Sequence, residues 1–174
     1  MDQSAYAAGL QHGYVKLSDG TILDIGAVVS AEGEKEVDEV EIKGDDELLK
    51  TFVFAQRESL TIVANGISFD VLAAITGNTP ASSPTGEEIA LGTDSEKNAP
   101  YVEIGAKSIA EDEAGTSCFL EKIWHKVQIK TTKLSQAGES EFNIEMAGIA
   151  YSTDEDIEGG ALSPKRVATV KLHS

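Results

Sequence analysis

Several segments of the chain alternate apolar and polar residues, which is the pattern of a β-strand with one buried face and one face in solvent. Between 139 and 146 one side of the pattern is acidic or amide and the other is apolar: Glu139, Glu141, Asn143 and Glu145 against Phe142, Ile144 and Met146. A helix would repeat its apolar face roughly every 3.6 residues instead. The alternation therefore predicts an antiparallel sheet that packs one face on a core.

Two further segments alternate in the same way. In the first, Ile123, Val127 and Ile129 oppose Lys122, Trp124, Lys126 and Gln128, which assigns the tryptophan to the polar side. In the second, Val167, Thr169 and Lys171 oppose Arg166, Ala168, Val170 and Leu172. The β-branched and aromatic residues in these runs favour strands over 122–129 and 166–172.

The first third of the chain predicts further strands and one long hairpin. Short apolar runs at 14–17 and 27–29 are separated by the turn signal Ser18-Asp19-Gly20. The segments 37–43 and 49–63 flank Gly44-Asp45-Asp46-Glu47 and are predicted to form the two arms of the hairpin. These arms carry too much charge to be buried on both faces. A strand is also expected over 101–106, with a turn at 111–115.

Only one segment has the pattern of a good helix. Ser68 is a candidate N-cap, Gly77 is a candidate C-terminal stop, and Phe69, Leu72, Ala73 and Thr76 are expected to share one face. Three of the four prolines follow in 78–100, which predicts a surface loop or small insert. The expected fold is a single domain over 1–174, mainly β: an antiparallel β-sandwich with one short flanking α-helix and a long hairpin.

The charge of the chain is strongly negative and unevenly distributed. Thirty acidic and fourteen basic residues give a formal charge of −16, so the molecular field repels phosphate and argues against tight binding of nucleic acid. Nine of the sixteen residues from Glu32 to Glu47 are acidic, whereas seven of the fourteen basic residues lie in 122–133 and 165–171. This segregation suggests that surfaces of opposite sign meet between subunits. The alternative is that the acidic residues only keep the protein soluble.

The segments that would mark a membrane or secreted protein do not stand out in the sequence. There is no run of eighteen apolar residues, and the start Met1-Asp2-Gln3-Ser4 has neither a basic nor an apolar signal region. We therefore expect the protein to be made and kept soluble in a cytoplasm. Cys118 is the single cysteine, which excludes an internal disulfide and a multi-cysteine metal cluster.

The inventory of chemically active residues predicts neither catalysis nor a cofactor or metal site. The histidines His12, His125 and His173 are scattered, and we expect His125 beside Trp124 to pack rather than to catalyse. Cys118 is expected to be a small core residue. The run 154–159 imitates the start of a calcium loop, but Lys165 stands where the bidentate glutamate is needed. Carboxylate pairs are abundant without being specific, so a hydrolase that uses such a pair stays open.

The order of several loose motifs resembles the major tail proteins of long-tailed, non-contractile bacteriophages. The residues that carry the likeness are Pro100-Tyr101-Val102, Gly105 and Ser108, followed by Trp124-His125-Lys126-Val127-Gln128. Upstream, an acidic hairpin, the run 60–66 and a short helix ending at 77 occur in the same order. The resemblance spans roughly 36–150, whereas 1–10 match nothing in that family.

This resemblance implies a structural subunit of the tail tube and not an enzyme. The implied protein forms hexameric rings whose inner sheets join into one barrel, with partners that are further copies of itself and the tape measure, tip and terminator proteins of the tail. The acidic residues that it assigns to the lumen are Glu39, Glu41, Glu139, Glu141 and Glu145. The hairpin turn that it assigns to contact with the next ring is Gly44, Asp45, Asp46, Glu47, Leu48 and Leu49.

Three alternatives remain open at this level. The first is a small acidic β-sandwich that binds a carbohydrate or a cell surface, the second is a hydrolase, and the third is a tube protein of a type VI secretion system. Self-assembly separates the tube subunits from the first two, because a binding module stays monomeric and a hydrolase turns over substrate.

Overall fold

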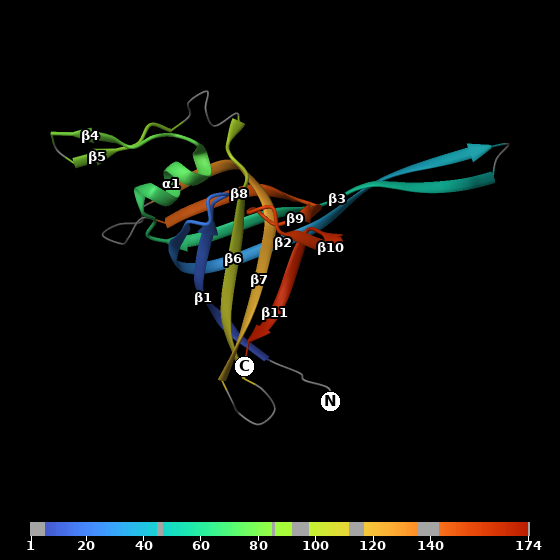
Figure 1. Cartoon of the computed structure of the whole chain (residues 1–174), viewed down its shortest axis with the longest axis horizontal. Coiled ribbons are helices and arrows are strands. Elements are labelled where there is room, and N and C mark those ends of the chain that lie inside the picture. The colour runs from blue at the N-terminus through green and yellow to red at the C-terminus, as the bar shows by residue number, and fades with distance from the viewer. Residues whose placement is uncertain are drawn as a thin grey trace.

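The computed structural model describes residues 6–44, 47–84, 86–91, 98–111, 117–135 and 143–173. The chain is built almost entirely from β-strands, with one short helix (Figure 1). The elements are β1 (Tyr6–Lys16), β2 (Ile22–Gly44), β3 (Glu47–Asn65), α1 (Phe69–Thr76), β4 (Ala81–Ser83), β5 (Gly86–Glu88), β6 (Val102–Glu111), β7 (Ser117–Ser135), β8 (Asn143–Tyr151), β9 (Thr153–Glu155), β10 (Ala161–Arg166) and β11 (Ala168–His173).

Seven of the strands form one antiparallel sheet in the order β11-β7-β6-β1-β2-β3-β8. A further pairing between β7 and β8 closes the sheet into a ring. This closure is possible because β7 is long: its first part pairs with β6 and β11, and its second part, from Val127 to Ser135, pairs with β8. The expected class, mainly antiparallel β with one short helix and a long hairpin, is confirmed, and the two facing layers are parts of one continuous sheet.

The core lies inside the closed sheet. Strand β8 alternates as predicted, with Ile144 and Met146 fully buried and Glu145 on the other face. The other large, fully buried side chains come from helix α1, with Val71 and Ile75, and from the other strands, with Val15, Ile25, Leu60, Ile62, Val102, Ile104, Trp124 and Val127. Phe142, which was predicted to join them, lies outside the described residues, as do Glu139 and Glu141.

The assignment of Trp124 to a polar face is wrong. Its side chain is 1% exposed. The cause is an irregularity in the pairing of β6 with β7, because Ile104 pairs with Trp124 whereas Val102 pairs with Val127. Three steps along β7 thus match two along β6, which is a β-bulge, and the bulge reverses the inward and outward positions along β7. Ile123, Val127 and Ile129 are buried, but strict alternation does not relate them.

Helix α1 begins and ends where the sequence predicts. The Ser68 hydroxyl accepts a hydrogen bond from the Val71 amide, and Gly77 closes the helix in the left-handed conformation with φ of 75°. The predicted face is only partly right, because Phe69 is 41% exposed. The buried residues are Val71, Leu72, Ile75 and Thr76. They form one stripe on the helix, and contact with β2 and β7 selects that stripe over the neighbouring one.

The predicted hairpin is formed by β2 and β3, paired from Ala27 with Asn65 to Gly44 with Glu47. It is longer than predicted, since the short run at 27–29 is part of β2. Figure 1 shows its distal half projecting from the body of the molecule as an arm.

In the loop predicted over 78–100, the described residues include one small hairpin, β4 with β5. In the segment predicted as a strand over 166–172, β10 ends at Arg166 and β11 begins at Ala168.

Candidate assembly surfaces

The arm presents strand edges that have no partner among the described residues. Strand β2 pairs with β1 only from Ile22 to Gly26, and β3 pairs with β8 only from Arg57 to Asn65. Beyond these stretches, the described parts of β2 and β3 pair only with each other. Unpaired N–H and C=O groups on such edges are a template for pairing with another chain. The arm is therefore the element of this fold best placed to hold a second molecule.

An ion-paired cluster fixes the base of the arm. Arg57 on β3 donates from Nε to the Glu36 carboxylate on β2 over 2.6 Å, and the Ser59 hydroxyl donates to the same carboxylate. The hydrogen bonds from Ser59 and Arg57 lower the pKa of Glu36. The arm thus leaves the body at a defined place rather than along a free hinge.

The residues assigned to contact with the next ring lie at the distal end of the arm. Gly44 is the last residue of β2 and pairs with Glu47, the first residue of β3, and Leu48 pairs with Lys43. Leu49 follows in β3. Asp45 and Asp46 lie outside the described residues. Gly44 and Glu47 thus end the two strands at the distal end of the hairpin, on either side of the predicted turn.

The acidic residues assigned to the lumen fall in separate places. Glu39 and Glu41 lie on the arm, where they pair in register with Val53 and Thr51. Glu145 lies on β8, and its carboxylate accepts a 2.7 Å hydrogen bond from Lys133 Nζ on β7. This ion pair is solvent-accessible, with side chains 67% exposed for Lys133 and 41% for Glu145. The structure therefore does not gather Glu39, Glu41 and Glu145 in one cluster within a single copy.

The outer face of the sheet carries a buried chain of hydrogen bonds centred on His125. Its Nδ1 lies 2.8 Å from a Glu103 carboxylate oxygen on β6, and its Nε2 lies 2.7 Å from the Thr169 hydroxyl on β11. The side chains of His125 and Glu103 are 6% and 7% exposed. Both ring nitrogens are thus engaged in tying three strands together. This arrangement agrees with the packing role expected for His125.

A second polar group fixes β11 beside the first. The Glu121 carboxylate on β7 accepts a 3.1 Å hydrogen bond from the Tyr14 hydroxyl and lies 2.9 Å from His173 Nε2 on β11. Burial works against the charge on Glu121, but the hydrogen bonds from His173 and Tyr14 and the charge of Lys107 outweigh it, so the pKa of Glu121 is lowered. Burial, followed by the charge of Glu121, raises the pKa of Tyr14 well above its usual range.

The ring of Tyr14 lies directly over Gly105, where a Cβ atom would approach it to 2.2 Å. Only glycine leaves room for the ring at this position.

A third polar group lies on the inner side of the sheet. The Glu58 carboxylate on β3 accepts hydrogen bonds from Lys122 Nζ at 2.5 Å and from Trp124 Nε1 at 3.0 Å. Lys122 also lies over the indole ring, 4.5 Å from its centroid. Sequence reasoning missed this group and the two outer ones, because their members lie far apart in the chain and no local spacing relates them.

The structure also shows the positions of Cys118 and of the acidic turn that were considered in the sequence. Cys118 is a buried core residue, as predicted. In the acidic turn, the Asp156 carboxylate accepts the backbone N–H groups of Glu158 and Gly160, which is the geometry of a side-chain-stabilised turn. Within the described ranges, no three His, Cys, Asp or Glu side chains are arranged to hold a metal ion. No helix in the described part of the chain has the length and apolar character needed to cross a bilayer.

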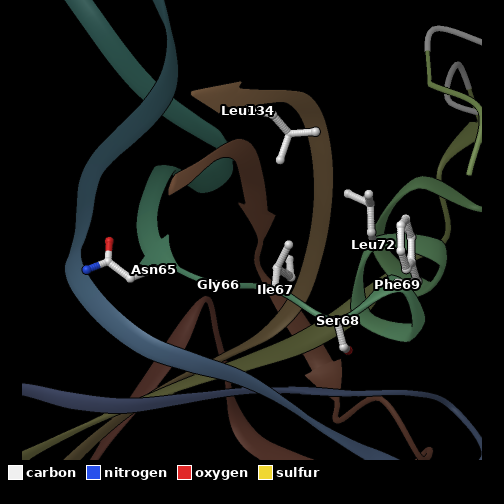
Figure 2. A pocket seen from close by; sticks show the side chains of 7 residues that line it. All are labelled: Asn65, Gly66, Ile67, Ser68, Phe69, Leu72 and Leu134. Atoms are coloured by element: carbon white, nitrogen blue, oxygen red, sulfur yellow. The ribbon is translucent and has the colours of Figure 1, made fainter. Parts of the chain in front are cut away.

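An apolar pocket of about 730 Å³ opens between α1 and the end of β7. Figure 2 shows Leu72 and Phe69 extending side by side from α1, Ile67 at the middle, and Leu134 facing them from β7. Leu72 is buried, and Ile67 packs against the core. Phe69 and Leu134, in contrast, are 41% and 45% exposed. The pocket is thus an apolar surface continuous with the core.

Comparison with known proteins gives distant structural likenesses only. No family model matches the chain, and no curated protein matches its sequence. One similar solved structure is described as the sixfold-symmetrised baseplate of an anti-feeding prophage, with 8% identity and a TM-score of 0.45 over 88% of this chain and 95% of that one. Another is described as a type six secretion system protein, with 12% identity and a TM-score of 0.37 over 92% and 94%. Likenesses at this distance do not define the function of the chain.

Proposed function

We propose that this protein is a structural subunit of a phage-type tail tube that self-assembles into stacked hexameric rings and forms the conduit for genome ejection. The observation that supports this most is the arm, a pair of long strands with unpaired outer edges that projects from the closed part of the sheet. Such edges are normally short or blocked in proteins that remain monomeric. Pairing between copies would cover them. The resemblance of the sequence to major tail proteins supplies the particular kind of assembly.

In the proposed tube, the tip of the arm contacts the adjacent ring through Gly44, Asp45, Asp46, Glu47, Leu48 and Leu49. The sequence there combines acidic residues with two leucines. This combination suits an apolar tip that enters a neighbour with a polar rim. Tape measure, tip and terminator proteins of the tail would bind the ends and the interior of the tube. The protein would be assembled in the host cytoplasm and reside in the tail of the virion.

The lumen of the proposed tube is acidic, so that DNA passes without tight binding. Six copies carry a formal charge of −96 (6 × −16). Salt screens this charge within about 8 Å at physiological ionic strength, so it acts only near the wall. We assign Glu39, Glu41, Glu139, Glu141 and Glu145 to the wall. Glu145 fits this assignment because it lies on the face opposite Ile144 and Met146, although Lys133 offsets part of its charge.

Mass measurement in solution tests the proposal. We expect mass photometry to show a species of 110 kDa (6 × 18.4 kDa) that grows at the expense of the monomer as the protein concentration rises. A folded protein that stays monomeric would instead match the small acidic binding module.

A further inference from the structure

The apolar pocket beside α1 exposes surface that a tube subunit would cover. Phe69 and Leu134 stand on opposite sides of its opening and are each more than two-fifths exposed, while its inner wall is formed by Ile67 and Leu72 (Figure 2). A partner segment that binds in such a pocket buries apolar surface without rearranging the pocket, because the inner wall is already packed.

The arm carries the apolar residues that could fill this pocket. The sequence from Leu48 to Phe54 contains Leu48, Leu49, Phe52, Val53 and Phe54. Its backbone pairs only with β2 within the described residues. At about 3.3 Å per residue, the stretch 37–44 alone spans about 25 Å, which is enough to reach into a neighbouring molecule.

Charge favours the same pairing. The segment of β2 and its turn from Glu32 to Glu47 is acidic at nine of sixteen positions. Leu134 of the pocket follows Lys130 and Lys133 on β7, both exposed. An acidic arm with apolar residues would thus meet an apolar pocket on a strand that also carries Lys130, whereas the charge of Lys133 is already offset by Glu145. This arrangement is the usual one for a specific contact, with an apolar centre and a polar rim.

The positions of the arm and the pocket decide the geometry of the assembly. Along the longest axis of the molecule, the arm projects from one side of the body and α1 lies on the other (Figure 1). A contact between two different surfaces of identical chains is heterologous, and it forms a closed ring or an open row according to the rotation between successive copies. An arm-to-pocket contact that does not close would stack copies in a row, as a tube requires.

We infer that the pocket formed by Ile67, Phe69, Leu72 and Leu134 is the receiving site for the arm of a second copy of this chain. The inference rests on the proposed function and deepens it by naming the surface that the arm contacts.

Disulfide trapping tests this pairing. In a Cys118→Ala background, one protein carries Leu134→Cys and another carries Leu49→Cys, so a mixed disulfide forms only between copies. The control replaces Leu134→Cys with Val170→Cys, since Val170 is 60% exposed and belongs to β11, a strand that lies away from α1 (Figure 1). We expect at least about tenfold more cross-linked dimer with Leu134→Cys than with Val170→Cys, because Cα atoms more than about 7 Å apart cannot be bridged. Circular dichroism confirms that each variant is folded.

The other outcomes are distinct. Tubes that form without preferential cross-linking through Leu134→Cys would overturn the receiving site and leave the proposed function standing. Protection of this thiol from a maleimide in dilute monomer would show that the chain itself covers the pocket, and would also overturn the inference. Protein that forms neither rings nor tubes before any substitution would contradict both the inference and the proposed function.

Discussion

The carboxylate of Glu58 accepts a 3.0 Å hydrogen bond from the indole nitrogen of Trp124, which lies 66 positions further along the chain. The two residues come from β3 and β7, which are not paired with each other, because β8 lies between them in the closed sheet. Their contact therefore crosses the interior rather than following a strand pair. Arg57 and Ser59, on either side of Glu58 in the sequence, hold Glu36 at the base of the arm.

The first prediction concerns the stability that Glu58 provides. Its replacement in Glu58→Ala should lower the free energy of unfolding by about 2 kcal/mol, because the buried Trp124 donor loses its acceptor and Lys122 loses its partner. The matched variant Glu145→Ala also removes a carboxylate paired with a lysine, but in an exposed pair that is worth about 0–1 kcal/mol. Urea denaturation of both variants measures the difference. Equal losses for the two would show that the interior contact is not stronger than a surface pair.

The sequence predicted the elements of this fold better than their contacts. The strands around Ile144 and Met146 and the caps of α1 at Ser68 and Gly77 follow from local pattern, and the structure has them there. Trp124 was misplaced because a bulge depends on the partner strand and leaves no mark in the alternation of β7 itself. Phe69 was misplaced because the packing of α1 on the sheet, and not the helix alone, selects the buried stripe.

The same distinction between local pattern and tertiary contact applies to the two candidate surfaces, the arm and the pocket. The hairpin of β2 and β3 was predicted from the residues of its own segments. The pocket could not be predicted, because Leu134 meets Phe69 and Leu72 only once β7 has crossed to pair with β8.

The second prediction concerns the acid side of the stability profile. Because the folded state lowers the pKa of Glu121, its charged form stabilises the protein above the ordinary glutamate pKa of about 4.3, and this contribution is lost as the pH falls through the folded value. The groups that face this carboxylate are Tyr14, Lys107 and His173. Glu121→Gln should cost about 1–2 kcal/mol at pH 7 and less at pH 3. Urea midpoints at both pH values provide the measurement, and a constant difference between wild type and variant would refute the linkage.

The third prediction concerns the tip of the arm. Deletion of residues 45–47 should leave a folded protein, since the pairing of β2 with β3 continues far beyond the tip. It should abolish polymerisation, because the proposed contact with the adjacent ring is shortened. Circular dichroism measures the first effect and sedimentation velocity measures the second. Tubes formed as readily as by the wild type would remove residues 44–49 from the contact.

The fourth prediction concerns the charge of the lumen. Changing Glu139, Glu141 and Glu145 to lysine should leave assembly intact if these residues face an open bore, but should line that bore with cations that hold phosphate. Particles built from this variant should eject DNA slowly or incompletely at low salt, and added salt should relieve the defect. A control variant with Glu155→Lys, at an exposed position of β9, should eject normally. Normal ejection by the triple variant at low salt, from fully assembled tubes, would place the three residues outside the lumen.

Assembly is the central claim, and electron microscopy of the purified protein at rising concentration tests it most directly. We predict rings of six copies at low concentration and stacks of such rings, growing into open tubes, as the concentration increases. Single folded copies at every concentration, with neither rings nor tubes in the images, would contradict the proposed function.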